Sequence, residues 1–418
     1  MLSDQMDQME EYLMSIGLMA RSLVESPTMR LNEEARKMRE RGEPVIHLGI
    51  GEPKSPTPVD AIRSAMAKLS DANIHYTPTD GTPELKQAII RYMDDNYDRQ
   101  VAPDQVIASG GAKQSLSVIL ASILNPQDEV IIPAPYWVSY PEMVKIAYGV
   151  PVIVHPEDGR FQPRFSEIAD AVTSYTKAII INNPNNPSGA IYSEDFIREI
   201  VRFCEGKGIW LIMDDIYHKL VYGGKMCVPA TRFTDRNIDD SKIIILNGIS
   251  KLYAMTGFRI GWVVAPRKLV KTMIKVQGHG SSCPPAVSQA AAAGALNGIQ
   301  SMVENLRLTL QNLRDLMVQE LEGFNGIRIT KPDGALYCLA DFRAYSNKSE
   351  ELAHFLLKKV MVVTVPGSAF GMEGFLRLSF CKSVKDITEG IARIKWALDT
   401  TSPNEIFIND HKLVRDWL

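Results

Sequence analysis

The feature that most constrains the fold of this 418-residue chain is an alternation of short apolar runs with helical patterns from about residue 105 onward. The runs are rich in Val and Ile and apolar on both faces, which is typical of strands buried between two layers of helices. The alternation predicts a mainly parallel sheet with right-handed crossovers, and therefore an α/β fold. The predicted strands are QVIAS, EVIIPA, VPVIVH, KAIIINN, GIWLIMD, KIIILNG and IGWVVAP.

The rest of the chain predicts a second, smaller part. A helical stretch from Pro285 to about Glu322 precedes short strands and helices, a mixture that indicates an α+β domain. A chain of this length favours two domains. We expect an N-terminal amphipathic helical segment that packs on the body or on a partner chain. The expected division is 1–25 for this segment, 60–312 for the large domain, 26–59 with 313–400 for the small domain, and 401–418 for a C-terminal extension.

Charge and cysteine usage exclude several classes of protein. The net charge is −3 with no long basic run, which argues against a nucleic-acid partner. The five cysteines are scattered and never form a CxxC pair, so a disulfide framework or a metal site is not expected. The N-terminus lacks the order of a secretory signal, and no apolar run is long enough for a membrane span. A cytoplasmic globular protein with no membrane partner is expected.

Polar residues follow several predicted strands, at the edge of an α/β sheet where ligands bind. The segment GGAKQS opens a helix, and its free N–H groups favour a phosphate, although a tight turn without ligand fits as well. The segment PNNPSG also fits a plain turn. Asp214 ends a buried strand, where an acid is costly unless it is paired. It could instead cap the following helix.

The segment NGISKLYAMTGFRIGW adds Lys251 just past a predicted strand and Arg259 eight residues later. Pyridoxal phosphate requires a lysine amine for a Schiff base and an acid beside its pyridine nitrogen. It also requires a donor to its ring hydroxyl and cations around its phosphate. Lys251, Asp214, Tyr217 and Arg259 are residues of these types. Together they favour this cofactor over the separate structural explanations.

Seven stretches resemble the fold-type I, class I aminotransferases, in order and spacing, from about Ser26 to Leu398. They are LGIGEP, YTPTDGTPELKQAI, PYWVSYPEM, NNPNNPSGAIY, DDIYHKL, SKLYAMTGFRIGW and FLRLSF. The chain is most similar to the bacterial aspartate aminotransferases of the subgroup that includes aspartate/prephenate aminotransferases. The resemblance implies a large domain with a seven-stranded, mainly parallel sheet covered by helices and a smaller α+β domain. It also implies pyridoxal phosphate as cofactor and a homodimer with shared active sites.

The resemblance assigns roles around the cofactor ring. Lys251 would form the Schiff base and later move a proton, and Asp214 would keep the pyridine nitrogen protonated. Tyr217 and Asn186 would hydrogen-bond the ring oxygen. Trp137 would stack on the ring, although a buried tryptophan without ligand is the alternative.

The resemblance also assigns the phosphate and the substrate carboxylate. The phosphate would be held by the group Gly111, Ala112, Lys113 and Arg259, joined by Tyr76 from the second copy of the chain. Gly248 stands where a serine often contacts the phosphate, so Ser250 is the weaker substitute. Arg377 would bind the substrate α-carboxylate, and Gly51 would let the chain close over the substrate.

The substrate side chain is less constrained. Gly278 stands where many dicarboxylate enzymes of the family carry a second arginine. Lys113 is therefore the best candidate for the distal carboxylate, with His279 as a second donor. A solvated lysine and a loop histidine are the alternatives. Val24 stands where prephenate-active relatives carry a lysine, which counts against prephenate.

The predicted function is ping-pong transamination between an L-amino acid, best aspartate, and a 2-oxo acid, 2-oxoglutarate. The alternatives are broader donor specificity (alanine, aromatic), a β-lyase or a cyclopropane-forming (ACC-synthase-like) enzyme on the same fold, or a regulator that kept the cofactor pocket. The resemblance also predicts cis bonds at Ala134–Pro135 and Asn186–Pro187.

Overall fold

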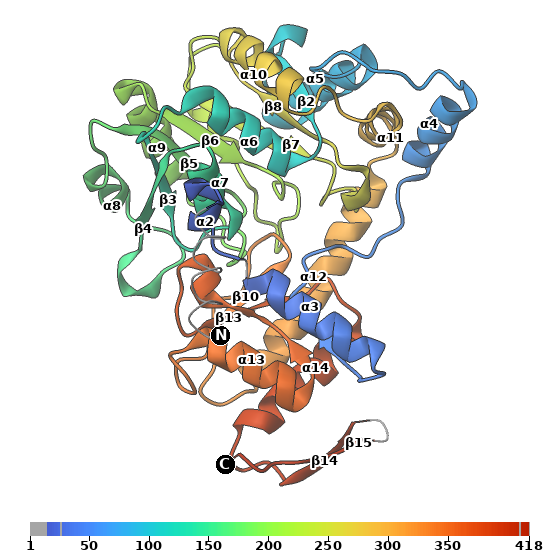
Figure 1. The fold of residues 1–418 in the computed structure, drawn as a ribbon, viewed down its shortest axis with the longest axis vertical. Coiled ribbons are helices and arrows are strands. Elements are labelled where there is room, and N and C mark those ends of the chain that lie inside the picture. The colour runs from blue at the N-terminus through green and yellow to red at the C-terminus, as the bar shows by residue number, and fades with distance from the viewer. Residues whose placement is uncertain (1–14, 26, 409–410, 418) are drawn as a thin grey trace.

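The computed structural model describes residues 15–25, 27–408 and 411–417, and a seven-stranded sheet lies in its upper body in the view of Figure 1. The strand order is β2-β8-β7-β6-β5-β3-β4, and the neighbours are parallel except that β8 runs antiparallel to both β2 and β7. The predicted strands are confirmed. They are β2 (Val106–Ser109), β3 (Glu129–Pro133), β4 (Val150–Val154), β5 (Thr176–Asn182), β6 (Trp210–Asp214), β7 (Ile243–Gly248) and β8 (Gly261–Val264).

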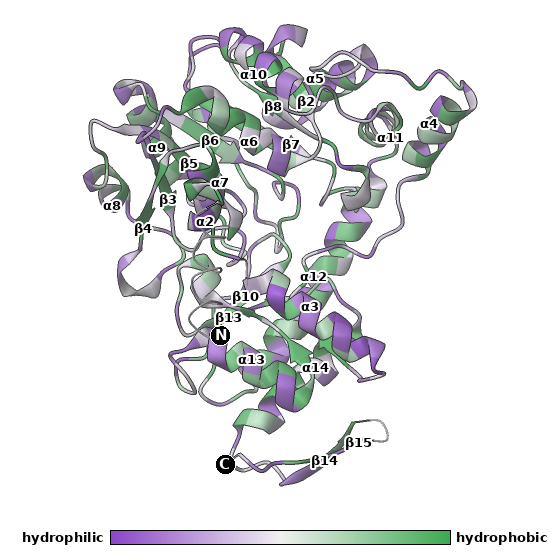
Figure 2. Ribbon diagram, viewed as in Figure 1, coloured by the Kyte–Doolittle hydropathy of each residue, from purple (hydrophilic) through white to green (hydrophobic). Residues whose placement is uncertain are grey.

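The apolar runs form strands because both faces of the sheet are covered. Ile179 and Ile181 of β5 belong to the core on one face, and Ile180 between them belongs to the core on the other. Each such buried side chain stabilises the fold by about 1.5–3 kcal/mol. Figure 2 shows much of this sheet as hydrophobic. The helices of this part are α4 (Val59–Ser70), α5 (Pro83–Tyr97), α6 (Ala112–Ile123), α7 (Ser139–Ile146), α8 (Phe165–Asp170), α9 (Glu194–Lys207), α10 (Arg267–Gly280) and α11 (Ala286–Asn297).

A second sheet of four antiparallel strands, ordered β12-β13-β10-β9, lies apart from the first. Its strands are β9 (Arg328–Ile329), β10 (Tyr337–Asp341), β12 (Val365–Pro366) and β13 (Phe375–Ser379). The helices nearby are α13 (Ser349–Val360) and α14 (Val384–Leu398). The short strand β1 (Ile46–His47) pairs in parallel with β11 (Val362–Val363), which joins an early segment to this late one.

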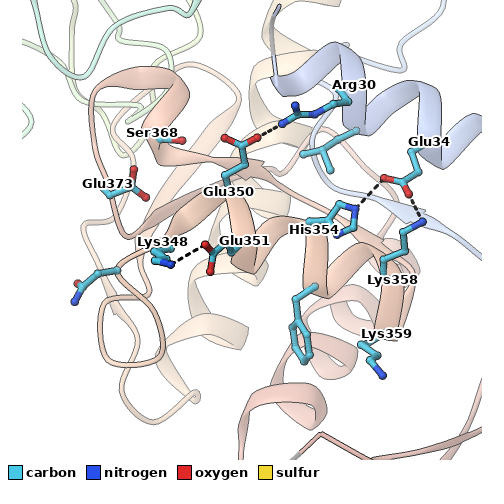
Figure 3. Close-up of a pocket in the computed structure, with 13 residues that line it drawn as sticks. Arg30, Glu34, Lys348, Glu350, Glu351, His354, Lys358, Lys359, Ser368 and Glu373 are labelled. Carbon is cyan, nitrogen blue, oxygen red and sulfur yellow. Dashed lines mark hydrogen bonds and ion pairs between the residues drawn. The ribbon is translucent and has the colours of Figure 1, made fainter. Parts of the chain in front are cut away.

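Two helices link distant parts of the chain. The predicted helical stretch from Pro285 to Glu322 is divided near Gly298 into α11 and α12 (Ser301–Glu322), and α12 extends from the first body to the second (Figure 1). Helix α3 (Pro27–Glu40) lies against α13, where Arg30 pairs with Glu350, and Glu34 pairs with Lys358 and His354 (Figure 3).

The terminal segments are described in part. Most of the expected N-terminal helical segment, residues 1–14, lies outside the described residues. Within 15–25, α2 (Leu18–Ser22) forms, and the N–H of Val24 donates to Glu142 on α7 over 3.1 Å. Near the C-terminus, β14 (Glu405–Ile408) and β15 (His411–Val414) form a hairpin. Trp417 then packs edge-on against Trp396 of α14.

Three further observations bear on the sequence predictions. The Ala134–Pro135 and Asn186–Pro187 bonds are cis, as predicted, and Asn183–Pro184 is also cis. All five cysteines are free. Among the described residues, no helix has the length and apolar character needed to cross a membrane.

Candidate active site

Strand direction explains why the predicted residues meet at one edge of the large sheet. Asp214 is the last residue of β6, and Lys251 follows the end of β7 by three residues. Because β8 runs antiparallel to β7, it begins at the same edge where β7 ends. Arg259 lies two residues before β8, so it returns to the carboxyl edge and does not lie at the far one.

Asp214 is a buried carboxylate without an ion pair among the described residues. Tyr140 donates its hydroxyl to Oδ2 over 2.6 Å, and the N–H of Ile216 donates to Oδ1 over 3.3 Å. The bond to Ile216 makes an Asx turn, and a turn, not a helix, follows the strand, so the helix-cap alternative is wrong. Burial raises the pKa of Asp214 to about 6, against the lowering effect of both hydrogen bonds and of Lys251.

The neighbouring acid, Asp215, faces away from this site. Tyr97 of α5 donates its hydroxyl to Asp215 over 3.1 Å, and Asn247 donates to the same hydroxyl over 2.9 Å. Burial raises the pKa of Asp215 to about 7. Of the two consecutive acids, only Asp214 is therefore oriented toward the edge that also carries Lys251 and Trp137.

Lys251 lies beside the segment that approaches from the early part of the chain. Its Nζ donates to the carbonyl oxygen of Gly51 over 2.8 Å. A Cβ on Gly51 would overlap the hydroxyl of Tyr337, which itself lies 3.2 Å from the hydroxyl of Tyr217. The glycine is thus required by Tyr337 in addition to any substrate. Ser250, next to Lys251, is buried.

The start of α6 carries positive charge. Gly111 precedes the helix with a φ of 93°, and a Cβ there would clash with the guanidinium of Arg259. The first N–H groups of a helix, here from Ala112 onward, have no intrahelical acceptor and lie at the positive end of the dipole. Lys113 remains exposed, 4.8 Å above the ring of Trp137. Its partial burial and the charge of Arg259 lower its pKa.

Arg377 is a buried guanidinium without an acidic partner among the described residues. Nη1 donates to Asn186 Oδ1 over 2.9 Å and Nη2 to the Gly49 carbonyl over 2.8 Å, while Nε has no hydrogen bond. Its Cζ lies 4.3 Å from the ring centroid of Tyr337. Because a buried cation is costly without a counter-charge, this arrangement fits an incoming carboxylate.

His47 supports Arg377 indirectly, through the backbone of Gly49. The N–H of Gly49 donates to His47 Nδ1 over 3.1 Å, so the ring proton must lie on Nε2, which is 2.7 Å from Asn32 Oδ1. Burial lowers the pKa of His47 to about 3, and nearby Arg39 and Lys382 contribute. The neutral ring therefore holds the backbone whose carbonyl positions Arg377.

Sequence reasoning missed Tyr140, Tyr337 and His47. Tyr140 lies three residues after Trp137, and the two rings meet edge-on with centroids 5.3 Å apart. The short separation from Trp137 was a usable signal, because Tyr140 lies in the first turn of α7, directly after the loop that carries Trp137. Tyr337 and His47 had no local signal.

Two predicted residues are not brought into this cluster within the single chain. Tyr76 is 91% exposed, and His279 is exposed near the end of α10. Neither has a recorded hydrogen bond or ion pair with another described residue. Their roles therefore stay predictions.

The residues present fit pyridoxal phosphate on their chemistry. A buried acid and a lysine amine lie close enough to interact, Tyr217 lies near the same acid, and Asn186 contacts Arg377. A glycine precedes the start of α6, next to the cations Arg259 and Lys113. The fold and this donor set are those of a pyridoxal-phosphate-dependent transferase.

Comparison with known proteins agrees. The sequence model of the family described as aminotransferase class I and II matches residues 43–394. A probable aspartate/prephenate aminotransferase of Aquifex aeolicus is 39% identical, with 90% of this chain and 96% of that protein covered. The aspartate aminotransferase of Streptomyces avermitilis is 36% identical, with 90% and 94% covered.

A solved structure of similar shape is the aspartate aminotransferase of Rhizobium meliloti. It has a TM-score of 0.88 and 34% identity, with 92% of this chain and 98% of that chain covered. The chain belongs to the class I and II aminotransferases, and it is a pyridoxal-phosphate-dependent enzyme that acts by transamination.

Proposed function

We propose that this aminotransferase takes its amino group from L-aspartate and passes it to 2-oxoglutarate. The observation that carries the proposal is the buried Arg377 without an acidic partner, together with Lys113 above Trp137 as a second cation. Two cations at separate points suit a substrate with two carboxylates. The names of the relatives, and a Thermus thermophilus aspartate aminotransferase solved with maleate at a TM-score of 0.86, support a dicarboxylate.

The cofactor, when bound, supplies a protonated ring that withdraws electrons from the substrate Cα. Asp214 would accept the ring N–H, and Tyr140 would keep that carboxylate ionised and in place. Tyr217 and Asn186 would donate to the ring oxygen, and Trp137 would stack on the ring. The phosphate would lie at the start of α6, held by the backbone N–H groups of Gly111, Ala112 and Lys113 and by the side chains of Arg259 and Ser250.

Lys251 would hold the cofactor and then move a proton from the substrate Cα. Its amine already donates a hydrogen bond to the Gly51 carbonyl, and this bond fixes its orientation. Arg377 would bind the α-carboxylate as a fork, which sets the direction of the Cα–H bond. Because Asn186 contacts Arg377, it would connect the carboxylate site to the ring oxygen.

The experiment that tests this function is a half-reaction. The holoenzyme mixed with L-aspartate and no acceptor should lose its lysine-bound absorbance and release about one 2-oxo acid per site. Alanine should react more slowly because it lacks the distal carboxylate. Release of ammonia would instead identify a β-lyase, and an unchanged spectrum would identify a binding protein.

Lys113→Ala is expected to reduce kcat/KM for aspartate by about 1.5–3 kcal/mol, as for a charged hydrogen bond, and to leave alanine unaffected. The reason is that only aspartate presents a carboxylate to this ammonium. Steady-state kinetics with both donors measures the difference. His279→Ala in the same assay tests the second donor. Equal losses for both donors would assign Lys113 to the phosphate and refute the dicarboxylate reading.

The proposal of a homodimer is based on an exposed apolar surface. Val59, Ile62, Met66 and Leu69 recur at helical spacing on α4 and are all exposed, close in sequence to exposed Ile74 and Tyr76. Such a stripe on a monomer is typical of a protein interface. In a two-fold dimer Tyr76 would reach the partner's phosphate site.

Met66→Glu is expected to shift the holoenzyme from dimer toward monomer and to lower activity with it, because a charge would be buried in the interface. Sedimentation velocity measures the shift. Met226→Glu, at an exposed methionine outside α4, is the matched control. A Met66→Glu protein that remains dimeric would place the interface elsewhere.

The domain division and the cytoplasmic location belong to the same proposal. The seven-stranded sheet falls within 60–312 and the four-stranded sheet within 313–400, which supports these limits. The β1–β11 pairing supports joining 26–59 to the small domain.

A further inference from the structure

A cavity of about 410 Å³ lies outside the candidate active site, between residues 54–56, helix α12 and the loop that follows β13. Lys54, Ser55, Lys382 and Ser383 contribute its polar wall. Leu313 and Cys381 are part of its apolar wall. Among the described residues, none of those that line this cavity is acidic.

Lys382 is buried and forms no ion pair among the described residues. It is 9% exposed and has no hydrogen bond or ion pair with any described residue, although it lines the cavity. Lys86 is equally buried but pairs with Asp80. Burial is the main cause that lowers the pKa of Lys382; the charges of Lys54 and Arg39 act in the same direction, and Cys381 and Asp386 oppose them only in part. An ammonium held this way is costly unless something else compensates it.

The other features of the cavity carry positive potential as well. Ser383 caps α14, its Oγ accepting from the N–H of Asp386 over 3.0 Å, so the positive end of this helix dipole lies at the cavity wall. Lys54 adds an exposed ammonium. The cavity is far larger than an inorganic anion, and much of its remaining wall is apolar.

A larger cavity, about 1080 Å³ between α3 and α13, differs in this respect (Figure 3). There Arg30 pairs with Glu350, Lys348 with Glu351 and Lys358 with Glu34. Charges that are paired within the chain do not call for a ligand. Lys382 has no such partner, so its charge favours binding of an anionic ligand.

We propose that the cavity at Lys382 binds a small organic carboxylate, its carboxylate on Lys382 and Lys54 and its apolar part against Leu313 and Cys381. This site is separate from the one that binds the amino acid, and the inference does not depend on the choice of aspartate.

The cavity shares two chain segments with the candidate active site. Lys54 follows Gly51 by three residues, and Lys382 follows Arg377 by five. Cys381, in the cavity wall, donates its thiol to the Ile50 carbonyl over 3.5 Å, next to the Gly51 that contacts Lys251. A bound carboxylate would therefore press on both segments, and we expect it to change KM for the amino acid more than kcat.

The first experiment measures binding of 4-iodobenzoate to the holoenzyme. Crystals soaked with this probe should show the anomalous signal of iodine in the cavity beside Lys382. Calorimetry should show two classes of site in the wild type, the cavity and the amino-acid site. Binding to the cavity should be weakened about tenfold or more in Lys382→Met. Lys385→Met, an exposed lysine on α14 outside the cavity, is the matched control and should keep both.

The second experiment measures thermal unfolding without the probe. Lys382→Met should be at least as stable as the wild type, because it removes an unpaired buried charge and keeps the volume. Added 4-iodobenzoate should raise Tm by a smaller amount in Lys382→Met than in the wild type.

Three outcomes would overturn the inference. They are a lower Tm for Lys382→Met without probe, equal binding in the variant and the wild type, and displacement of the probe by inorganic phosphate at equal concentration. None of these readouts uses catalytic activity, so failure here is distinct from failure of the proposed function.

Discussion

Lys251→Ala is expected to lower kcat by about 10⁴-fold or more, which is the upper range for removing a positioned general base. The expected loss is large because the variant would lack both the amine that holds the cofactor and the group that moves the Cα proton. No other amine is held in the same place, since the Gly51 carbonyl accepts only from Lys251 among the described side chains.

The measurement combines turnover with the absorption spectrum of the protein. The variant should still bind the cofactor through the α6 start and Asp214, but without the pH-dependent band of a lysine-bound form. Lys242→Ala, a lysine above the ring of Trp210, is the control and should keep both activity and spectrum. A lysine-bound spectrum in Lys251→Ala would refute the assignment.

Asp214→Asn is expected to lower kcat by about 10²–10³-fold, the range for removing one preorganised electrostatic group. The amide is nearly isosteric, so Tyr140 and Ile216 can keep their positions. The charge that would stabilise the protonated ring is absent, and the substrate Cα proton should become harder to remove. KM for aspartate should change little, because Arg377 is untouched.

Asp215→Asn is the matched control, because it changes the adjacent acid that faces Tyr97. It should leave kcat within a few-fold of the wild type. If it cost as much as Asp214→Asn, the two acids would have to exchange roles.

The raised pKa of Asp214 also predicts how the stability of the cofactor-free protein depends on pH. Burial raises the pKa of Asp214 to about 6, so its neutral form is favoured by folding. That stability is present at low pH and is lost as the pH rises through about 6. Cofactor-free Asp214→Asn should therefore lose less stability than the wild type between about pH 4 and pH 7, as measured by urea unfolding.

Local sequence determined the elements of the large sheet. The runs around Ile179–Ile181 and Ile243–Ile245 could be identified as buried strands because both faces of each strand are apolar, and this pattern lies within a few residues. The same local view located Asp214 and Lys251, since a polar residue at the end of such a strand is conspicuous. The resemblance added Arg377 and Asn186, which composition alone could not connect.

Tertiary structure decided which of these side chains meet. Only the antiparallel direction of β8 returns Arg259 to the edge that holds Lys251. Only the packing of α5 shows that Asp215 faces Tyr97 and leaves Asp214 to face the site. Tyr337 and the unpaired Lys382 were equally invisible, because their environments are built from segments far apart in sequence. Hydrogen bonds and burial of this kind depend on long-range packing, which the short periodicities of the chain do not specify.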